Sequence, residues 1–203
     1  YEDLCAVNLE VQQWDVPTIN LFGTIDDGHG RWAEHMWNGS DIYHPNQVGH
    51  EAMASAFPLT MWEALQAGKP LPEYICTEGD ENGVACVSFV REGQVQSYTL
   101  SYVSADTAYT EVYSAAQKKL WLYANGQQVS VTEGIDKTVG TITIQGSNIH
   151  QVFFFRAAMT EREVRALARG KMLRSSLEIY CPLLGGDTTN YAQTMNCVAI
   201  HNK

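Results

Sequence analysis

A series of short β-strand patterns, separated by turn residues, is the feature that most constrains the fold of this chain. Asn125-Gly126 lies between the apolar segments 120–123 and 129–131, and Asn-Gly supplies the two positive φ angles of a type I′ hairpin turn. We expect seven strands, at residues 86–91, 98–103, 110–115, 119–124, 127–131, 141–145 and 152–156. Many short strands at this spacing predict a β-sandwich.

One helix is expected to interrupt these strands. Residues 160–163 read Thr-Glu-Arg-Glu, which is the capping-box pattern at the start of a helix. Gly170 is suited to end that helix because glycine adopts the left-handed backbone conformation readily. The sequence therefore predicts a short helix packed on the sandwich.

Residues 1–68 follow a different pattern. Helical spacing over 4–11 precedes a predicted strand at 17–22, a long polar loop and a second helix that begins after Asn46, with Pro58 expected to interrupt it. A single strand cannot form a sheet, so this unit is expected to be the C-terminal segment of a larger α/β domain.

The boundary between the two units is expected at the turn-rich stretch 69–75. This divides the chain into an α/β segment at 1–68, a linker at 69–75 and a β-sandwich at 76–203. We expect limited contact across this linker, with the β-sandwich folding on its own and residues 1–68 unable to do so without the rest of their α/β domain.

The charge balance excludes a general nucleic-acid binder. The 203 residues include 13 Lys+Arg and 23 Asp+Glu, a formal charge of −10, whereas binding to phosphate backbones needs clustered cations. No stretch approaches the roughly 20 apolar residues of a membrane span, and the acidic start does not read as a signal peptide. We expect a folded protein without a membrane span, secreted or displayed on a cell or virion surface, whose export signal lies upstream or has been removed.

The five cysteines leave two readings open. The pairs Cys76/Cys86 and Cys181/Cys197 would each close a short loop, which fits two disulfides in an exported protein. Cys5 would then remain unpaired. Five reduced thiols are the other reading, since no C-x-x-C pair indicates zinc or redox chemistry.

The most informative motif is Asp41-Ile42-Tyr43-His44-Pro45-Asn46-Gln47-Val48-Gly49-His50. An Asp three residues before a His can accept a hydrogen bond from one ring nitrogen and leave the other free. This is the acid and base of a nucleophilic triad, in which the imidazole takes a proton from a serine hydroxyl. The other reading is that Asp41 and His44 only hold the loop in place.

This ten-residue segment resembles the last conserved block of the SGNH (GDSL-type) hydrolases. The resemblance covers about residues 1–68 and implies a flavodoxin-like α/β/α fold, esterase activity, and Asp41 and His44 as acid and base. The serine block Gly-Asp-Ser, the oxyanion-hole glycine and the Gly-x-Asn-Asp block of that family are not in this chain, where Gly186-Asp187 is followed by Thr188. The serine is therefore expected from upstream sequence or from another chain.

Four histidines near this motif, His29, His35, His44 and His50, raise the question of a metal. Their spacings of six, nine and six residues match no common zinc signature and no single helical face. We expect no metal here and interpret His50 as structural.

The second unit resembles the concanavalin-like (LamG-type) sandwich. Two segments carry the resemblance, Leu-Trp-Leu-Tyr-Ala-Asn-Gly at 120–126 and the stretch 149–164 that includes the capping box. It covers about residues 84–185 and implies a jelly roll that binds carbohydrate or protein, often with calcium. Calcium ligands are not assigned; the scattered candidates are Asp80, Glu81, Asp106 and Asp136. The strand aromatics either stack on sugar rings or form the core; they are Tyr98, Tyr102, Tyr109, Tyr113, Trp121 and Tyr123.

Together these features predict the C-terminal portion of an SGNH-type ester hydrolase, a carbohydrate esterase or deacetylase, joined to a lectin-like sandwich. No cofactor is expected beyond a possible calcium ion, and the expected partner is an acylated polysaccharide or glycan. The alternative is a non-catalytic carbohydrate- or surface-binding or structural protein, such as an adhesin or a virion component.

Overall fold

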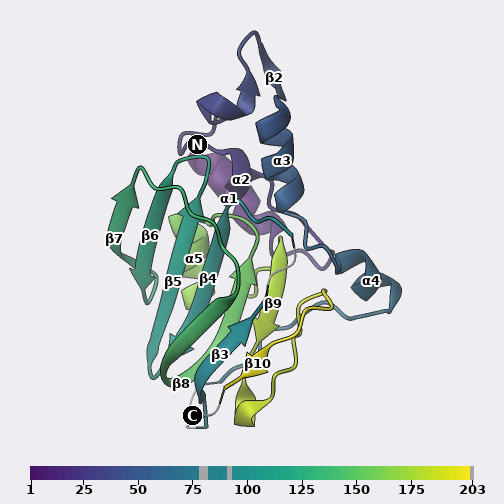
Figure 1. Cartoon of the computed structure of the whole chain (residues 1–203), viewed down its shortest axis with the longest axis vertical. Helices are drawn as coiled ribbons and strands as arrows, with labels where there is room; N and C mark the ends of the chain where they lie inside the picture. Colours follow the sequence, from purple (N-terminus) through teal and green to yellow (C-terminus); the bar gives the residue numbers. More distant parts are fainter. Residues whose placement is uncertain (78–81, 91–92, 202–203) are drawn as a thin grey trace.

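The computed structural model describes residues 1–77, 82–90 and 93–201 (Figure 1). Most of residues 84–200 form an antiparallel β-sandwich. Its strands are β3 (Val84–Phe89), β4 (Tyr98–Ser104), β5 (Thr107–Ser114), β6 (Lys119–Ala124), β7 (Gln127–Glu133), β8 (Ile142–Phe155), β9 (Leu177–Cys181) and β10 (Ala199–Ile200). The order of paired strands is β10-β3-β8-β4-β5-β6-β7, and β9 also pairs with β8. The predicted β-sandwich is confirmed, although Arg91, the last residue of the first expected strand, lies outside the described residues.

Strand β8 has two halves that pair with different strands. Its first half pairs with β3, and its second half lies between β4 and β9. The two strands expected at 141–145 and 152–156 are therefore one strand, interrupted by positive φ angles at Asn148 and Gln151. Burial alternates along the first half and becomes continuous along the second, which is the pattern of a strand covered on both faces.

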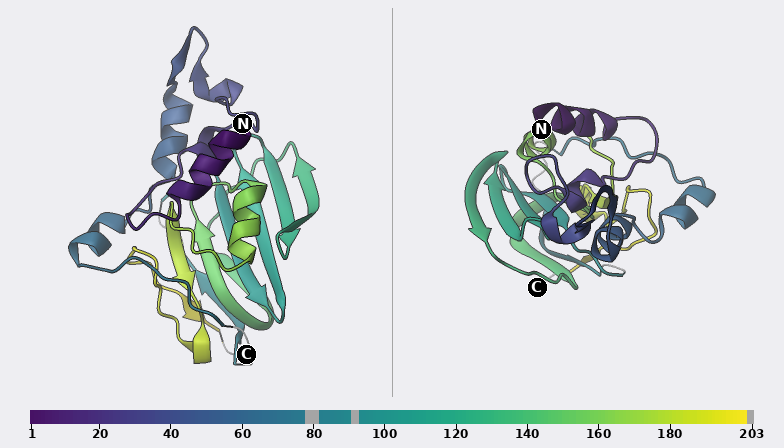
Figure 2. Two further views of the ribbon diagram at one scale, coloured as in Figure 1. Left: turned by 180° about the vertical axis from the view of Figure 1, so that it is seen from behind. Right: turned by 90° about the horizontal axis from the view of Figure 1, so that it is seen from above.

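The covered half of β8 contributes to two cores. Val152 and Phe154 pack in a cluster with residues of β3, β4, β5 and β9. Phe153 and Phe155 face the opposite way and pack against α5 (Glu161–Ala168). Figure 2 shows α5 and α1 (Glu2–Val11) together over this second face.

The local signals within the sandwich are confirmed. Asn125 and Gly126 have φ angles of 50° and 75° and form the tip of the β6–β7 hairpin. The side chain of Thr160 accepts from the N–H of Glu163, and the Glu163 carboxylate accepts from the N–H of Thr160, as a capping box requires. Gly170 has a φ of 76° just past the end of α5.

The first part of the chain contains three more helices, α2 (Phe22–Ile25), α3 (Gln47–Ser55) and α4 (Met61–Gln66), and a 3₁₀ turn, η1 (Glu34–Met36). A second 3₁₀ turn, η2 (Leu184–Gly186), follows β9. The break between α3 and α4 contains Pro58, as expected. Two short strands, β1 (Trp37–Asn38) and β2 (Asp41–Pro45), form a separate hairpin.

The strand expected at 17–22 is wrong. Residues 17–21 have irregular backbone, and α2 follows them. The physical reason is that this segment binds the sandwich instead of neighbouring strands: the carbonyl of Thr18 accepts from the N–H of Ser176, and the N–H of Asn20 donates to the hydroxyl of Ser176. A strand-like sequence pattern does not reveal which distant segment will form hydrogen bonds with its backbone N–H and C=O groups.

Contact between the first part of the chain and the sandwich is extensive, so the expectation of limited contact is wrong. The buried guanidinium of Arg156 donates through Nε to the carbonyl of Ser55 at 2.7 Å. The Lys69 ammonium donates to the carbonyls of Asn190 and Thr194 at 2.6 and 2.7 Å. These contacts hold α3 and the 69–75 stretch firmly against the sandwich. The placing of a domain boundary at 69–75 stays a prediction.

All five cysteines are free thiols, so the disulfide reading is wrong and the reduced one holds. In each expected pair one thiol is buried and its partner is exposed: Cys86 and Cys181 lie inside, whereas Cys76 and Cys197 lie at the surface. The residues of each pair thus face different environments. Within the part of the chain that the structure describes, no helix is long and apolar enough to span a bilayer.

Candidate active site

The residues singled out by the SGNH-like motif lie on the β1–β2 hairpin and the start of α3, at the upper end of the molecule in Figure 1. In the register of the hairpin, Asn38 pairs with Asp41 and Trp37 pairs with Pro45. Asp41 and His44 both lie on β2. This strand ends at Pro45, directly before Asn46, the N-cap of α3. The hairpin is anchored at its base by the helix that follows it.

Asp41 and His44 are hydrogen-bonded, as predicted. His44 Nδ1 lies 2.5 Å from Asp41 Oδ2, and the other carboxylate oxygen accepts from the N–H of Tyr43 at 3.0 Å. The hydrogen bond to His44, followed by that to Tyr43, lowers the pKa of Asp41 below its ordinary value. The carboxylate therefore stays ionised and can only accept a hydrogen bond.

This pairing fixes the tautomer of His44. Because the ionised Asp41 accepts, Nδ1 carries the proton, and in the neutral ring Nε2 is left as a hydrogen-bond acceptor. The side chain of His44 is 74% exposed, that of Asp41 38%. Nε2 has no hydrogen-bond partner among the described residues. Nε2 is therefore open to a hydrogen-bond donor from solvent or from another molecule.

Two further residues of the motif set the position of the hairpin. The Asn46 side chain caps α3 by accepting from the N–H of Gly49, and its amide donates to the carbonyls of His35 and Trp37 at 2.9 and 3.1 Å. A Cβ on Gly49 would lie 2.3 Å from the carbonyl oxygen of Met36. Glycine is required there because α3 approaches the backbone before the hairpin so closely.

No nucleophile accompanies the pair in the described residues: no serine, threonine or cysteine is hydrogen-bonded to His44. At this exposure the His44 ring faces solvent. The hydrogen bond is confirmed, whereas the catalytic roles of Asp41 and His44 stay predictions. A complete triad needs a serine and an enclosing wall from further polypeptide.

The structure also bears on the metal candidates. Across residues 1–77, 82–90 and 93–201, no three His, Cys, Asp or Glu side chains cluster closely enough to hold a metal ion. Asp136 forms an ion pair with Lys118 at 3.3 Å, and Asp106 is exposed. Asp80 and Glu81 lie outside the described residues. Calcium ligands remain unassigned.

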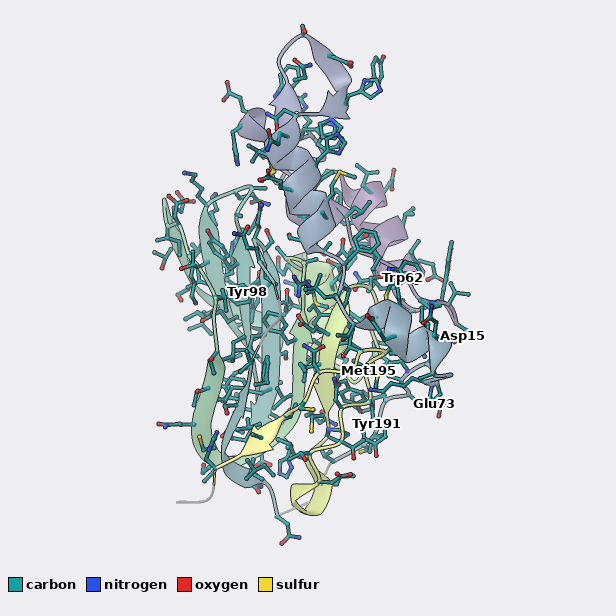
Figure 3. All side chains as sticks on the ribbon, turned by 45° about the vertical axis from the view of Figure 1, so that its right-hand side comes forward. Asp15, Trp62, Glu73, Tyr98, Tyr191 and Met195 are labelled. Carbon is teal, nitrogen blue, oxygen red and sulfur yellow. The ribbon has the colours of Figure 1, made fainter. Side chains whose placement is uncertain are left out.

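The aromatic residues of the strands divide into two groups. Tyr98, Tyr113 and Tyr123 are buried. The rings of Tyr102 and Tyr109 stack with their centroids 5.5 Å apart on a partly exposed part of the sheet. Figure 3 labels Tyr98 on the sheet, and its ring stacks on a phenylalanine of β8.

The sixth aromatic residue, Trp121, lines a cavity that the sequence did not predict. This cavity, of about 640 Å³, lies between α1, α2 and α5 on one side and β5, β6 and β7 on the other. We refer to it as the α1–α5 cavity; Asp41 and His44 do not line it. Its walls come from segments far apart in the chain. The only local signal was the spacing of Trp121 and Tyr123, which places both rings on one face of a strand.

Comparisons with known proteins add little to this geometry. No protein-family model matches the chain, and no curated protein sequence matches it. A solved structure from Bacteroides ovatus ATCC 8483, described as a "putative carbohydrate binding protein", aligns with a TM-score of 0.45 and 13% sequence identity. The alignment covers 60% of this chain and 59% of that one, so the chain spans less than two thirds of that structure's length. A similarity this low does not assign a function.

Proposed function

We propose that this chain is the C-terminal portion of an SGNH-type ester hydrolase, a carbohydrate esterase or deacetylase, in which Asp41 and His44 are the acid and base of a catalytic triad. The serine comes from outside the chain, either from upstream sequence of the same protein or from another chain. The observation that carries the proposal is the 2.5 Å contact from His44 Nδ1 to Asp41, which leaves Nε2 exposed.

The proposed reaction follows from this arrangement. His44 Nε2 accepts the serine proton as the hydroxyl oxygen attacks the acyl carbonyl, and Asp41 stabilises the imidazolium that forms. The proton then passes to the sugar oxygen as the alcohol leaves. Water then attacks the acyl-serine while the same imidazole takes its proton, and that proton passes to the serine oxygen as the acid is released. The substrate is an acylated polysaccharide. The protein itself is secreted or displayed on a cell or virion surface.

Exposed apolar side chains in the first part of the chain support the need for further polypeptide. Val7 on α1 is 61% exposed, Trp62 on α4 is 60% exposed, and Val48 on α3 is also exposed. Figure 3 shows Trp62 on the outer side of α4. These three side chains belong to α1, α3 and α4, the helices that would pack against a sheet in a complete α/β domain. The missing sheet of an SGNH domain would cover helices in this way.

The test is acetate release from acetylated xylan by the complete protein that contains this sequence. We expect His44→Ala to lower kcat by about a thousandfold or more, while His50→Ala, an exposed change on α3, leaves it unaltered. A fluorophosphonate probe should label a serine outside residues 1–203. The proposal fails if the complete protein does not release acetate, or if His44→Ala retains full activity.

The alternative proposal is a non-catalytic glycan- or surface-binding protein, such as an adhesin or virion component. It is supported by the partly exposed Tyr102–Tyr109 stack on the sandwich and by the lack of a nucleophile among the described residues bonded to His44. The same assay separates the two: a complete protein that binds polysaccharide, releases no acetate and takes no fluorophosphonate label would be a binder.

A further inference from the structure

We propose that the α1–α5 cavity is a glycan-binding site that takes an uncharged sugar unit and is separate from the Asp41–His44 pair. The inference extends the proposed function, because it assumes that polysaccharide is the partner. It assigns that contact to a surface made jointly by the N-terminal helices and the sandwich. Four features of the cavity support this assignment: its size, its aromatic floor, its free amides and its charge balance.

The size and position of the cavity fit a small ligand. Its volume of about 640 Å³ lies within the roughly 300–1,000 Å³ of typical small-molecule sites, which occur preferentially where structural units meet. Tyr1, Cys5 and Phe22 form the wall from α1 and α2, and Ser114 and Trp121 belong to the opposing sheet. A ligand would therefore contact both parts of the chain at once.

Trp121 and Tyr123 provide a rigid apolar floor. They are alternate residues of β6 and face the same side, toward α5. Tyr123 is buried, and burial raises its pKa to about 12, so the ring stays neutral. Trp121 is only partly buried and keeps surface for a ligand. A sugar ring has a face of C–H groups that packs on an aromatic ring, with its hydroxyls left at the edge.

Two amide side chains are placed to bind those hydroxyls. The side chain of Gln117, which follows β5, reaches the loop at Gly28. A Cβ atom added to that glycine would lie 3.0 Å from the Gln117 Oε1. Gln128, at the start of β7, pairs in register with Tyr123. Neither side-chain amide has a hydrogen-bond partner among the described residues. Each amide offers both a donor and an acceptor, as a hydroxyl requires.

The charges around the cavity favour an uncharged ligand. Arg162 is paired with Glu2 at 2.9 Å, and Arg165 is paired with Glu161. Within each pair the positive and negative charges compensate, so the two arginines do not form the cluster of cations that phosphate or a polyanion needs. Arg169 is the one lining cation without a carboxylate partner in the described residues. Because an unpaired arginine attracts anionic ligands, the binding experiment includes an acidic polysaccharide.

The test measures binding of the intact protein to soluble oligosaccharides from xylan, mannan and cellulose, and to polygalacturonate, by isothermal titration calorimetry. We expect a neutral oligosaccharide to bind, and Trp121→Ala to weaken binding about tenfold or more. Gln128→Ala should weaken it about threefold. Trp62→Ala removes an exposed tryptophan from α4, outside the cavity, and should bind as the wild type does.

Thermal melts establish that the variants are folded. If Trp121→Ala does not fold, the exposed Gln128→Ala decides the question alone. The inference is overturned if no neutral oligosaccharide binds, if only polygalacturonate binds, or if folded cavity variants keep wild-type affinity. Oligosaccharide binding and hydrolysis of a small soluble acetyl ester are both measured on the wild-type protein. Failure of the glycan site and failure of the proposed esterase are thus separate results.

Discussion

At the scale of single residues, Glu163 links the two parts of the chain through a carboxyl group that is completely buried. It accepts from the N–H of Thr160 at 2.5 Å, from the Asn8 amide at 2.6 Å and from the Gln12 amide. It forms no ion pair with any described residue. Burial raises its pKa from 4.5 to about 7, although the hydrogen bonds act in the opposite direction.

This carboxyl predicts a pH dependence of stability. Between about pH 4.5 and 7 the folded state binds more protons than the unfolded state, so the free energy of unfolding falls as pH rises through this window. The contribution is fully present below pH 4.5 and lost above 7, and it amounts to no more than about 3 kcal/mol. In urea unfolding at a series of pH values, Glu163→Gln should remove this decline, whereas the exposed Glu10→Gln should retain it. Parallel profiles for wild type and Glu163→Gln would contradict the prediction.

At the scale of elements, the motif that holds the candidate active site is also a helix-start device. Asn46→Ala should lower the free energy of unfolding by about 1 kcal/mol because the cap of α3 is lost. Gly49→Ala should also destabilise, although alanine normally gains about 1 kcal/mol over glycine within a helix, because its Cβ would collide with the Met36 carbonyl. Urea unfolding measures both, with His50→Ala as the control. A stabilising Gly49→Ala would show that α3 can shift away from the hairpin.

The sequence predicts elements well where the determining interactions are local. The Asn125-Gly126 turn, the capping box at Thr160 and the Asp41–His44 hydrogen bond each depend on residues at most three positions apart. The strand expected at 17–22 was wrong because its actual partner, Ser176, is more than 150 positions away. Strand β9 was missed because all five of its residues are buried, including Glu178, so no alternation marks it. The α1–α5 cavity was missed for the same long-range reason.

At the scale of the whole molecule, a buried ion pair between the residue after β8 and strand β9 also holds the end of α3. Arg156 is 1% exposed and bonds to Glu178 at 3.1 Å, to the carbonyl of Ser55 and to that of Gln94. Glu178 also accepts from the Asn196 amide at 2.8 Å. Because these five residues belong to five separate segments of the chain, their loss should affect the entire fold.

Removing one partner should cost more than removing both. Arg156→Met should lower the free energy of unfolding by about 3–5 kcal/mol because it leaves the Glu178 carboxylate buried without its cation. Adding Glu178→Met should restore part of that loss, since no buried charge then remains. Chemical denaturation of the two single variants and the double variant measures the coupling. A double variant whose loss equals the sum of the two single losses would mean that the two charges act independently.

The pairing of the second half of β8 with two strands has a consequence for amide hydrogen exchange. Residues 152–155 pair with β4 on one side and β9 on the other, and both faces are buried. Their N–H groups reach water only when neighbouring strands separate, so their exchange reports global unfolding. In the described parts of the chain the β1–β2 hairpin pairs with no other strand, so it can open locally. The imidazole of His44 therefore sits on one of the segments of the molecule that is easiest to open, and a partner that closes over it would slow exchange there first.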